Sequence, residues 1–162
     1  MDVEEHGARL EIMDLISEYT VSNDRGEWDR MERIWAEDAV MKVPGVGLGR
    51  YEGREAITAR FRNGDARTLR ANLADTRDQA QMSVSRHHLT STRLTFVDSS
   101  CAEGVTYYLV ITDAGYDHSG TYEDRFVKID GRWLIAERTT QVEHVAPDSY
   151  YGGLLRAAVT PS

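Results

Sequence analysis

The first third of the chain carries its apolar residues at helical spacing. Between residues 4 and 23, apolar side chains recur every three or four positions, which predicts an amphipathic helix. Gly26 interrupts the pattern, and residues 28–35 predict a second short helix. Residues 39–47 are typical of a strand, and residues 53–64 predict a third short helix. Helices therefore dominate the N-terminal part of the chain.

From residue 81 onward the pattern is typical of β-strands, with many β-branched residues and short turns. Four strands are expected, at residues 82–97, 105–113, 119–129 and 132–145, and Asp130-Gly131 is a strong hairpin signal. Helices followed by a long antiparallel meander indicate an α+β fold. Because a strongly curved sheet needs cover on its concave face, the helices are expected to close a half-open cone around a pocket.

Composition and charge narrow the class of protein. The 162 residues are 41% hydrophobic and 28% charged, which predicts one globular domain over residues 1–162. The net charge of −8 argues against binding to nucleic acid or to an anionic membrane surface. No apolar run approaches the roughly 18 residues of a membrane span, and the acidic N-terminus does not resemble a signal peptide. The single cysteine, Cys101, fits a cytoplasmic protein.

Three motifs carry a family resemblance: IWAEDAV at residues 34–40, GRYEGREAI at 49–57 and YEDRFVKIDGRWLIAER at 122–138. Their order resembles the SnoaL-like branch of the nuclear-transport-factor-2-like (NTF2-like) superfamily, over about residues 8–145. The resemblance implies an NTF2-like α+β cone barrel, in which N-terminal helices cover a curved antiparallel sheet around a central pocket. This superfamily includes dehydratases, dehydrohalogenases, isomerases, epoxide hydrolases, polyketide cyclases and non-catalytic binding modules, so fold alone does not fix function.

Within that superfamily, the spacing is most similar to enzymes of the scytalone dehydratase, bile-acid dehydratase and hexachlorocyclohexane dehydrochlorinase types. These enzymes share a His–Asp dyad in the cone. The resemblance assigns its aspartate to Asp24, eleven residues before Trp35, and its histidine to His87, where the strand HHLTSTRLTF begins. It also matches Tyr19, five residues before the aspartate, and Arg138 in the last motif. These positions are the predicted catalytic residues.

Elementary chemistry supports the same assignment. A neutral imidazole can take a proton near pH 7, and a buried carboxylate orients it and stabilises the imidazolium. His87 would abstract a proton next to an electron-withdrawing group while a leaving group departs, with Asp24 behind it. Tyr19 would donate a hydrogen bond, and Arg138 would stabilise developing negative charge.

Each of these residues also has a plainer interpretation. Asp24 could cap a turn, and Arg138 could be half of a structural ion pair. Strand alternation directs His88 away from His87. His118, in the stretch AGYDHSG, is expected in a solvated turn.

Four residues are expected to line the pocket as substrate-binding walls: Tyr51, Tyr108, Tyr122 and Thr140. Tyr51 could instead only pack under the third helix. A mainly apolar pocket favours a small cyclic, steroid-like or polyketide-derived molecule. No cofactor and no metal are expected, because the chain has no dinucleotide or phosphate-binding motif and adjacent strand histidines point apart.

The leading hypothesis is a cofactor-independent, dehydratase-like lyase that uses His–Asp general base catalysis. An isomerase or a polyketide cyclase could use the same pocket. A non-catalytic binding module would instead leave Asp24 and His87 out of hydrogen-bond reach, or fill the pocket with side chains. The resemblance also implies a homodimer or homotrimer formed through the convex sheet face, and the segment VTYYLVI is apolar on both faces, which would support it.

Overall fold

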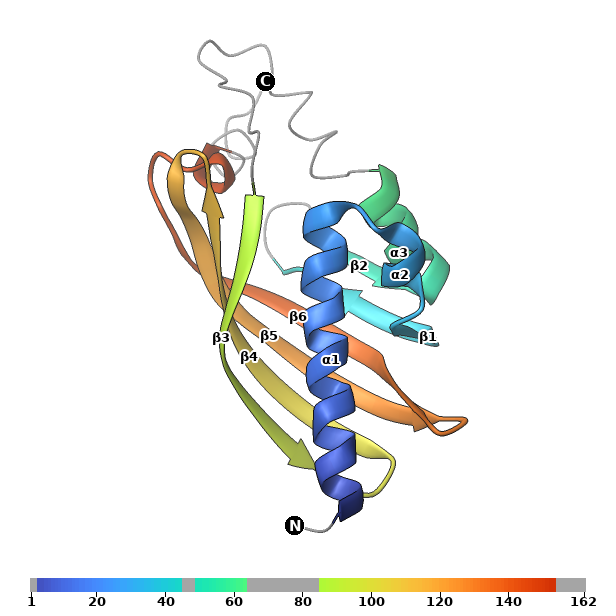
Figure 1. Cartoon of the computed structure of the whole chain (residues 1–162). Coiled ribbons are helices and arrows are strands. Elements are labelled where there is room, and N and C mark those ends of the chain that lie inside the picture. Colours follow the sequence, from blue (N-terminus) through green and yellow to red (C-terminus); the bar gives the residue numbers. More distant parts are fainter. Residues whose placement is uncertain (1–2, 45–48, 64–84, 154–162) are drawn as a thin grey trace.

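The computed structural model describes residues 3–44, 49–63 and 85–153. Its elements are α1 (Val3–Arg25), α2 (Trp28–Glu32), β1 (Trp35–Lys42), β2 (Arg50–Glu52), α3 (Arg54–Asn63), β3 (Ser85–Phe96), β4 (Cys101–Thr112), β5 (Gly115–Ile129) and β6 (Arg132–Val145) (Figure 1). A further helical turn covers residues 150–153. Within this part of the chain no helix is long and apolar enough to cross a membrane.

The described strands form one six-stranded sheet in the order β2-β1-β6-β5-β4-β3. All neighbouring pairs are antiparallel except β1 and β6, which are parallel. The long strands β3–β6 curve, α1 lies against one face of the sheet, and α2 and α3 stand beside α1 near β1 and β2 (Figure 1). The face that α1 covers is called the inner face, and the opposite face the outer face.

The core lies between α1 and the inner face. Ile12 and Ile16 of α1 are fully buried, in one cluster with Trp35, Phe126 and Ile135 of the strands. Every second residue of β4 is buried along the whole strand, as expected for a strand with one face on the core. The apolar face of α1 therefore packs on the apolar inner face of the sheet, as the spacing of apolar residues in both elements predicts.

The register of β5 shifts once against β4 and twice against β6, and two of these irregularities lie near His118. Against β4, Asp117 is an extra residue between Tyr116 and His118, which is the arrangement of a β-bulge. Against β6, the register shifts at Gly120, where an added Cβ atom would lie 1.9 Å from the carbonyl oxygen of Gln141. Only glycine permits so close an approach of the two strands.

The α+β class, the first and third helices and the four-stranded meander agree with the sequence prediction. The predicted end of the second helix is wrong, because α2 stops at Glu32 and Trp35 already pairs with Ile135 of β6. The turn expected around His118 is also wrong, because β5 starts at Gly115. The polar stretch at residues 65–80 lies outside the described residues.

Candidate active site

Asp24 is placed by the last turn of α1. The helix ends because Gly26 adopts a left-handed conformation with φ of 72°, and the amide of Glu27 then donates to the carbonyl of Ser22 at 2.9 Å. This termination leaves the Asp24 side chain beside the first residues of β3, where it is only 8% exposed. Asp24 therefore does not cap α2, whose N-cap residue is Glu27.

The Asp24 carboxylate binds His87 through both oxygens. Oδ1 lies 2.6 Å from the ring Nδ1 of His87, and Oδ2 accepts the backbone N–H of His87 at 2.9 Å. Because an ionised carboxylate only accepts hydrogen bonds, Nδ1 is the donor of this contact, and Nε2 is the atom that has a lone pair whenever the ring is neutral. No described residue hydrogen bonds to that Nε2, and the side chain keeps 18% of its surface exposed. The next residue, His88, is exposed, as alternation predicts.

A row of aromatic rings leads away from His87 along the inner face. The Tyr108 ring centroid is 6.3 Å from that of His87, and it stacks on Tyr122 at 4.4 Å. Tyr122 in turn meets Tyr19 of α1 edge to face at 5.6 Å. Burial raises the pKa of all three tyrosines, so their hydroxyls stay protonated at neutral pH. The Tyr108 hydroxyl donates to the carbonyl of Gln141 at 3.2 Å.

Arg138 lies at the end of this row and is fully buried. Its Nε and Nη2 atoms donate to the two carboxylate oxygens of Asp124, each at 2.7 Å. The guanidinium carbon is 4.0 Å from the ring centroid of Tyr19 and 4.4 Å from that of Tyr122. Burial opposes the charge, but Asp124 outweighs it and raises the pKa of Arg138, which stays cationic. Nη1 has no hydrogen-bond partner among the described residues, and neither has the buried Oγ1 of Thr140 on the same strand.

Tyr51 is the predicted pocket residue that the structure places apart from the Asp24–His87 contact. It lies on β2, half-buried, with the guanidinium of Arg60 5.2 Å from its ring centroid. The same guanidinium covers Phe61 at 4.9 Å, and Phe61 meets Tyr19 at 5.9 Å. Tyr51 is thus linked to the aromatic row through α3 and not through the sheet.

A second histidine–carboxylate contact was missed by the sequence interpretation. His118 lies inside β5, where its Nδ1 is 2.7 Å from Oδ1 of Asp117, and the two side chains are 15% and 3% exposed. The His118 ring meets Tyr108 at 5.9 Å and Tyr151 at 4.5 Å. The expectation of a solvated turn is therefore wrong. The bulge that turns both residues of the pair inward has no local sequence signal.

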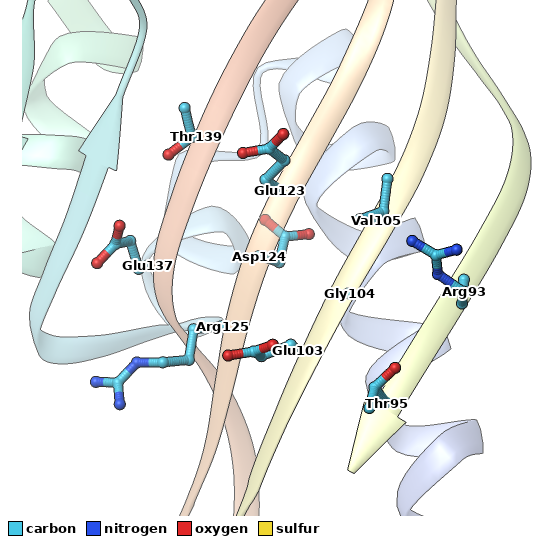
Figure 2. Close-up of a pocket in the computed structure, with 10 residues that line it drawn as sticks. All are labelled: Arg93, Thr95, Glu103, Gly104, Val105, Glu123, Asp124, Arg125, Glu137 and Thr139. Atoms are coloured by element: carbon cyan, nitrogen blue, oxygen red, sulfur yellow. The ribbon is translucent and has the colours of Figure 1, made fainter. Parts of the chain in front are cut away.

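A separate hollow of about 390 Å³ lies on the outer face of the sheet (Figure 2). Its rim carries charges of both signs, including Arg93, Glu103, Glu123 and Arg125. These positions alternate with the residues of the inner face, so the hollow lies across the sheet from His87. The predicted association of copies through the outer face stays a prediction. Among the described residues, no three His, Cys, Asp or Glu side chains gather as a metal site would require.

An open, curved sheet with helices on one face is the architecture of the NTF2-like class of α+β cones. The chain belongs to the SnoaL-like domain family, whose model matches residues 4–139.

Three relatives illustrate this membership. Gamma-hexachlorocyclohexane dehydrochlorinase of Sphingobium indicum is 22% identical over 151 residues, which cover 90% of this chain and 87% of the relative. The crystal structure of hexachlorocyclohexane dehydrochlorinase LinA-type3 from Novosphingobium barchaimii LL02 has a TM-score of 0.72 at 21% identity, covering 90% and 93% of the two chains. A scytalone dehydratase-like protein of Novosphingobium aromaticivorans DSM 12444 has a TM-score of 0.69 at 17% identity, covering 90% and 91%. At these identities the likeness establishes the shared fold.

Proposed function

We propose that this protein is a cofactor-independent lyase of dehydratase type, which acts on a small cyclic organic molecule with His87 as general base. The observation that carries the proposal is the 2.6 Å contact between Asp24 and the Nδ1 atom of His87. It holds the ring in the tautomer whose Nε2 can accept a proton. Membership of a family with lyases among its members supports the same reaction class.

The proposed reaction is an elimination across two adjacent carbons. A proton next to an electron-withdrawing group passes to Nε2 of His87, and the electron pair of the broken C–H bond forms the new C=C bond. The leaving group on the neighbouring carbon departs with its own bonding pair. Asp24 stabilises the imidazolium until its proton returns to solvent.

Arg138 and Tyr19 are proposed to stabilise the negative charge that develops on the substrate. Two of the Arg138 donor atoms are occupied by Asp124, so Nη1 is the atom proposed to face the substrate. A fixed cation needs no reorganisation when charge develops, which is the condition for effective electrostatic catalysis. The aromatic row suits a cyclic, largely apolar substrate, with Tyr108, Tyr122 and Thr140 as its walls.

Other functions of the same site are weaker candidates. An isomerase or a cyclase would use the same proton abstraction and differ only in the fate of the carbanion. A non-catalytic binding module has no need for a histidine oriented by a carboxylate, and the contact between Asp24 and His87 counts against it.

The test is an elimination assay on two compounds that differ in leaving group. Chloride release from gamma-hexachlorocyclohexane is followed by ion chromatography, and water loss from scytalone by absorbance. We expect wild-type turnover of at least one compound, and a fall in kcat/KM of at least about 100-fold in His87→Gln and in Asp24→Asn. His88→Gln, the same change on the exposed side of β3, is the matched control and should keep wild-type activity. An inactive wild type, or a fully active His87→Gln, would contradict the proposal.

A further inference from the structure

The His118–Asp117 pair lies in the same cross-strand row as His87. Val110 of β4 is the Cα partner of His87 on β3 and also of His118 on β5. Residues directly opposite each other in an antiparallel sheet point to the same face, and Val110 is buried on the inner face. The two imidazoles therefore flank one valine, with backbones two strand spacings, or about 10 Å, apart. Both rings contact the ring of Tyr108.

Each of the two histidines has the same hydrogen-bonding arrangement. In both, a nearly buried carboxylate occupies Nδ1, and Nε2 has no hydrogen-bond partner among residues 3–44, 49–63 and 85–153. Asp117 also accepts the backbone amides of Tyr150 and Tyr151, at 2.8 and 3.3 Å. These bonds anchor the last helical turn without using the imidazole of His118. A structural role for Asp117 thus leaves Nε2 of His118 unexplained.

We propose, on the basis of the proposed function, that His118 is the general acid of the elimination and that the leaving group is a hydroxyl. His118 enters the reaction as an imidazolium, and its Nε2 donates a proton to the hydroxyl as the C–O bond breaks, while Nε2 of the neutral His87 ring takes the proton from the adjacent carbon. The products are an alkene and one water molecule. Solvent then removes the proton from His87 and reprotonates His118, so the enzyme is restored without any redox step.

The spacing and the chemistry agree with this assignment. A hydrogen and a hydroxyl on neighbouring carbons, with a hydrogen bond of about 3 Å at each end, span roughly 8 Å, which fits side chains that reach inward from backbones about 10 Å apart. Hydroxide is a poor leaving group near pH 7 and needs a proton, whereas chloride leaves without one. A second histidine held by a carboxylate is therefore useful for losing water and dispensable for losing chloride.

The test compares the two leaving groups in His118→Asn. Asparagine keeps a donor near Asp117 and removes the acid at Nε2. We expect water loss from scytalone to fall at least about 100-fold and chloride loss from gamma-hexachlorocyclohexane to fall less than about tenfold, whereas His87→Gln lowers both. His88→Asn, the same change at an exposed histidine of β3, is the matched control. If His118→Asn does not fold, His118→Gln replaces it.

The remaining outcomes separate the inference from the proposed function. An equal fall for both leaving groups, or no fall for either, overturns the role of His118 and leaves the lyase proposal standing. If the wild type releases chloride but does not remove water, the role of His118 is likewise overturned and the lyase proposal still stands. If the wild type removes only water, kcat of His118→Asn should fall while KM stays within about threefold, and a change confined to KM overturns the inference. If the wild type eliminates neither group, both proposals fail.

Discussion

At the scale of single residues, Asp117 makes the stability of the protein depend on pH. Burial alone would raise the pKa of its carboxyl, but the hydrogen bond and charge of His118 and the amides of Tyr150 and Tyr151 outweigh burial and lower it. A lowered carboxyl pKa contributes stability that is present above the unfolded value, about 3.9, and is lost as the pH falls through the folded value.

We therefore expect the free energy of unfolding of the wild type to exceed that of Asp117→Asn at pH 6, by an amount that shrinks as the pH falls below about 4. Urea unfolding between pH 2.5 and 7 measures the difference. Asp14→Asn, the same change at an exposed aspartate of α1, is the control. A difference that stays constant over this range would contradict the pKa shift.

The site residues differ in how far the sequence could predict them. Asp24 and His87 were placed by their spacing from motifs of the family resemblance, and the structure brings them into contact. The partner of Arg138 could not be read in this way, because Asp124 becomes its neighbour only when β5 and β6 pair. His118 was misplaced because a bulge depends on the register of two strands and not on local composition.

At the scale of elements, the close contact of β5 with β6 allows a sharp prediction. In Gly120→Ala the new methyl group would collide with a backbone carbonyl that cannot move without disrupting β6. We expect a loss of at least about 2 kcal/mol of unfolding free energy. Gly7→Ala is the matched control, because Gly7 lies in α1 with open space around it, and alanine should stabilise the helix by about 0.5–1 kcal/mol. Urea unfolding of the two variants should give opposite signs, and equal signs would contradict the strand geometry.

Local periodicity best predicts an element whose conformation is set by its own residues and not by a distant partner. The long helix α1 and the strands β3 and β6 have clear patterns and lie close to their predicted ranges, whereas β4 and β5 each begin four residues earlier than predicted. The boundary between α2 and β1 is different. Trp35 fits the helical spacing of the residues before it, yet it enters a strand because Ile135, a hundred residues later, pairs with it. A long-range pairing of this kind leaves no trace in a short sequence window.

At the scale of the whole molecule, the order of the strands controls how fast the protein folds. β1 lies between β2 and β6, so the sheet is complete only after two distant segments have met. Many long-range contacts slow folding, and we expect refolding in the range of milliseconds to seconds. Stopped-flow fluorescence can follow it, because the buried Trp35 and Trp133 lie on the two strands that meet. Refolding in microseconds would contradict this expectation.

The parallel pairing of β1 with β6 also has a consequence for synthesis on the ribosome. The helix α1 is complete at Arg25, but β6, which pairs with both β1 and β5, is complete only at Val145. At about 5–20 residues per second, the nascent chain carries the uncovered apolar stripe of α1 for roughly 6 to 24 seconds. Asp24 and His87 both leave the ribosome before Arg138 does. The apolar face of α1 is therefore open to non-native contacts until the last strand arrives.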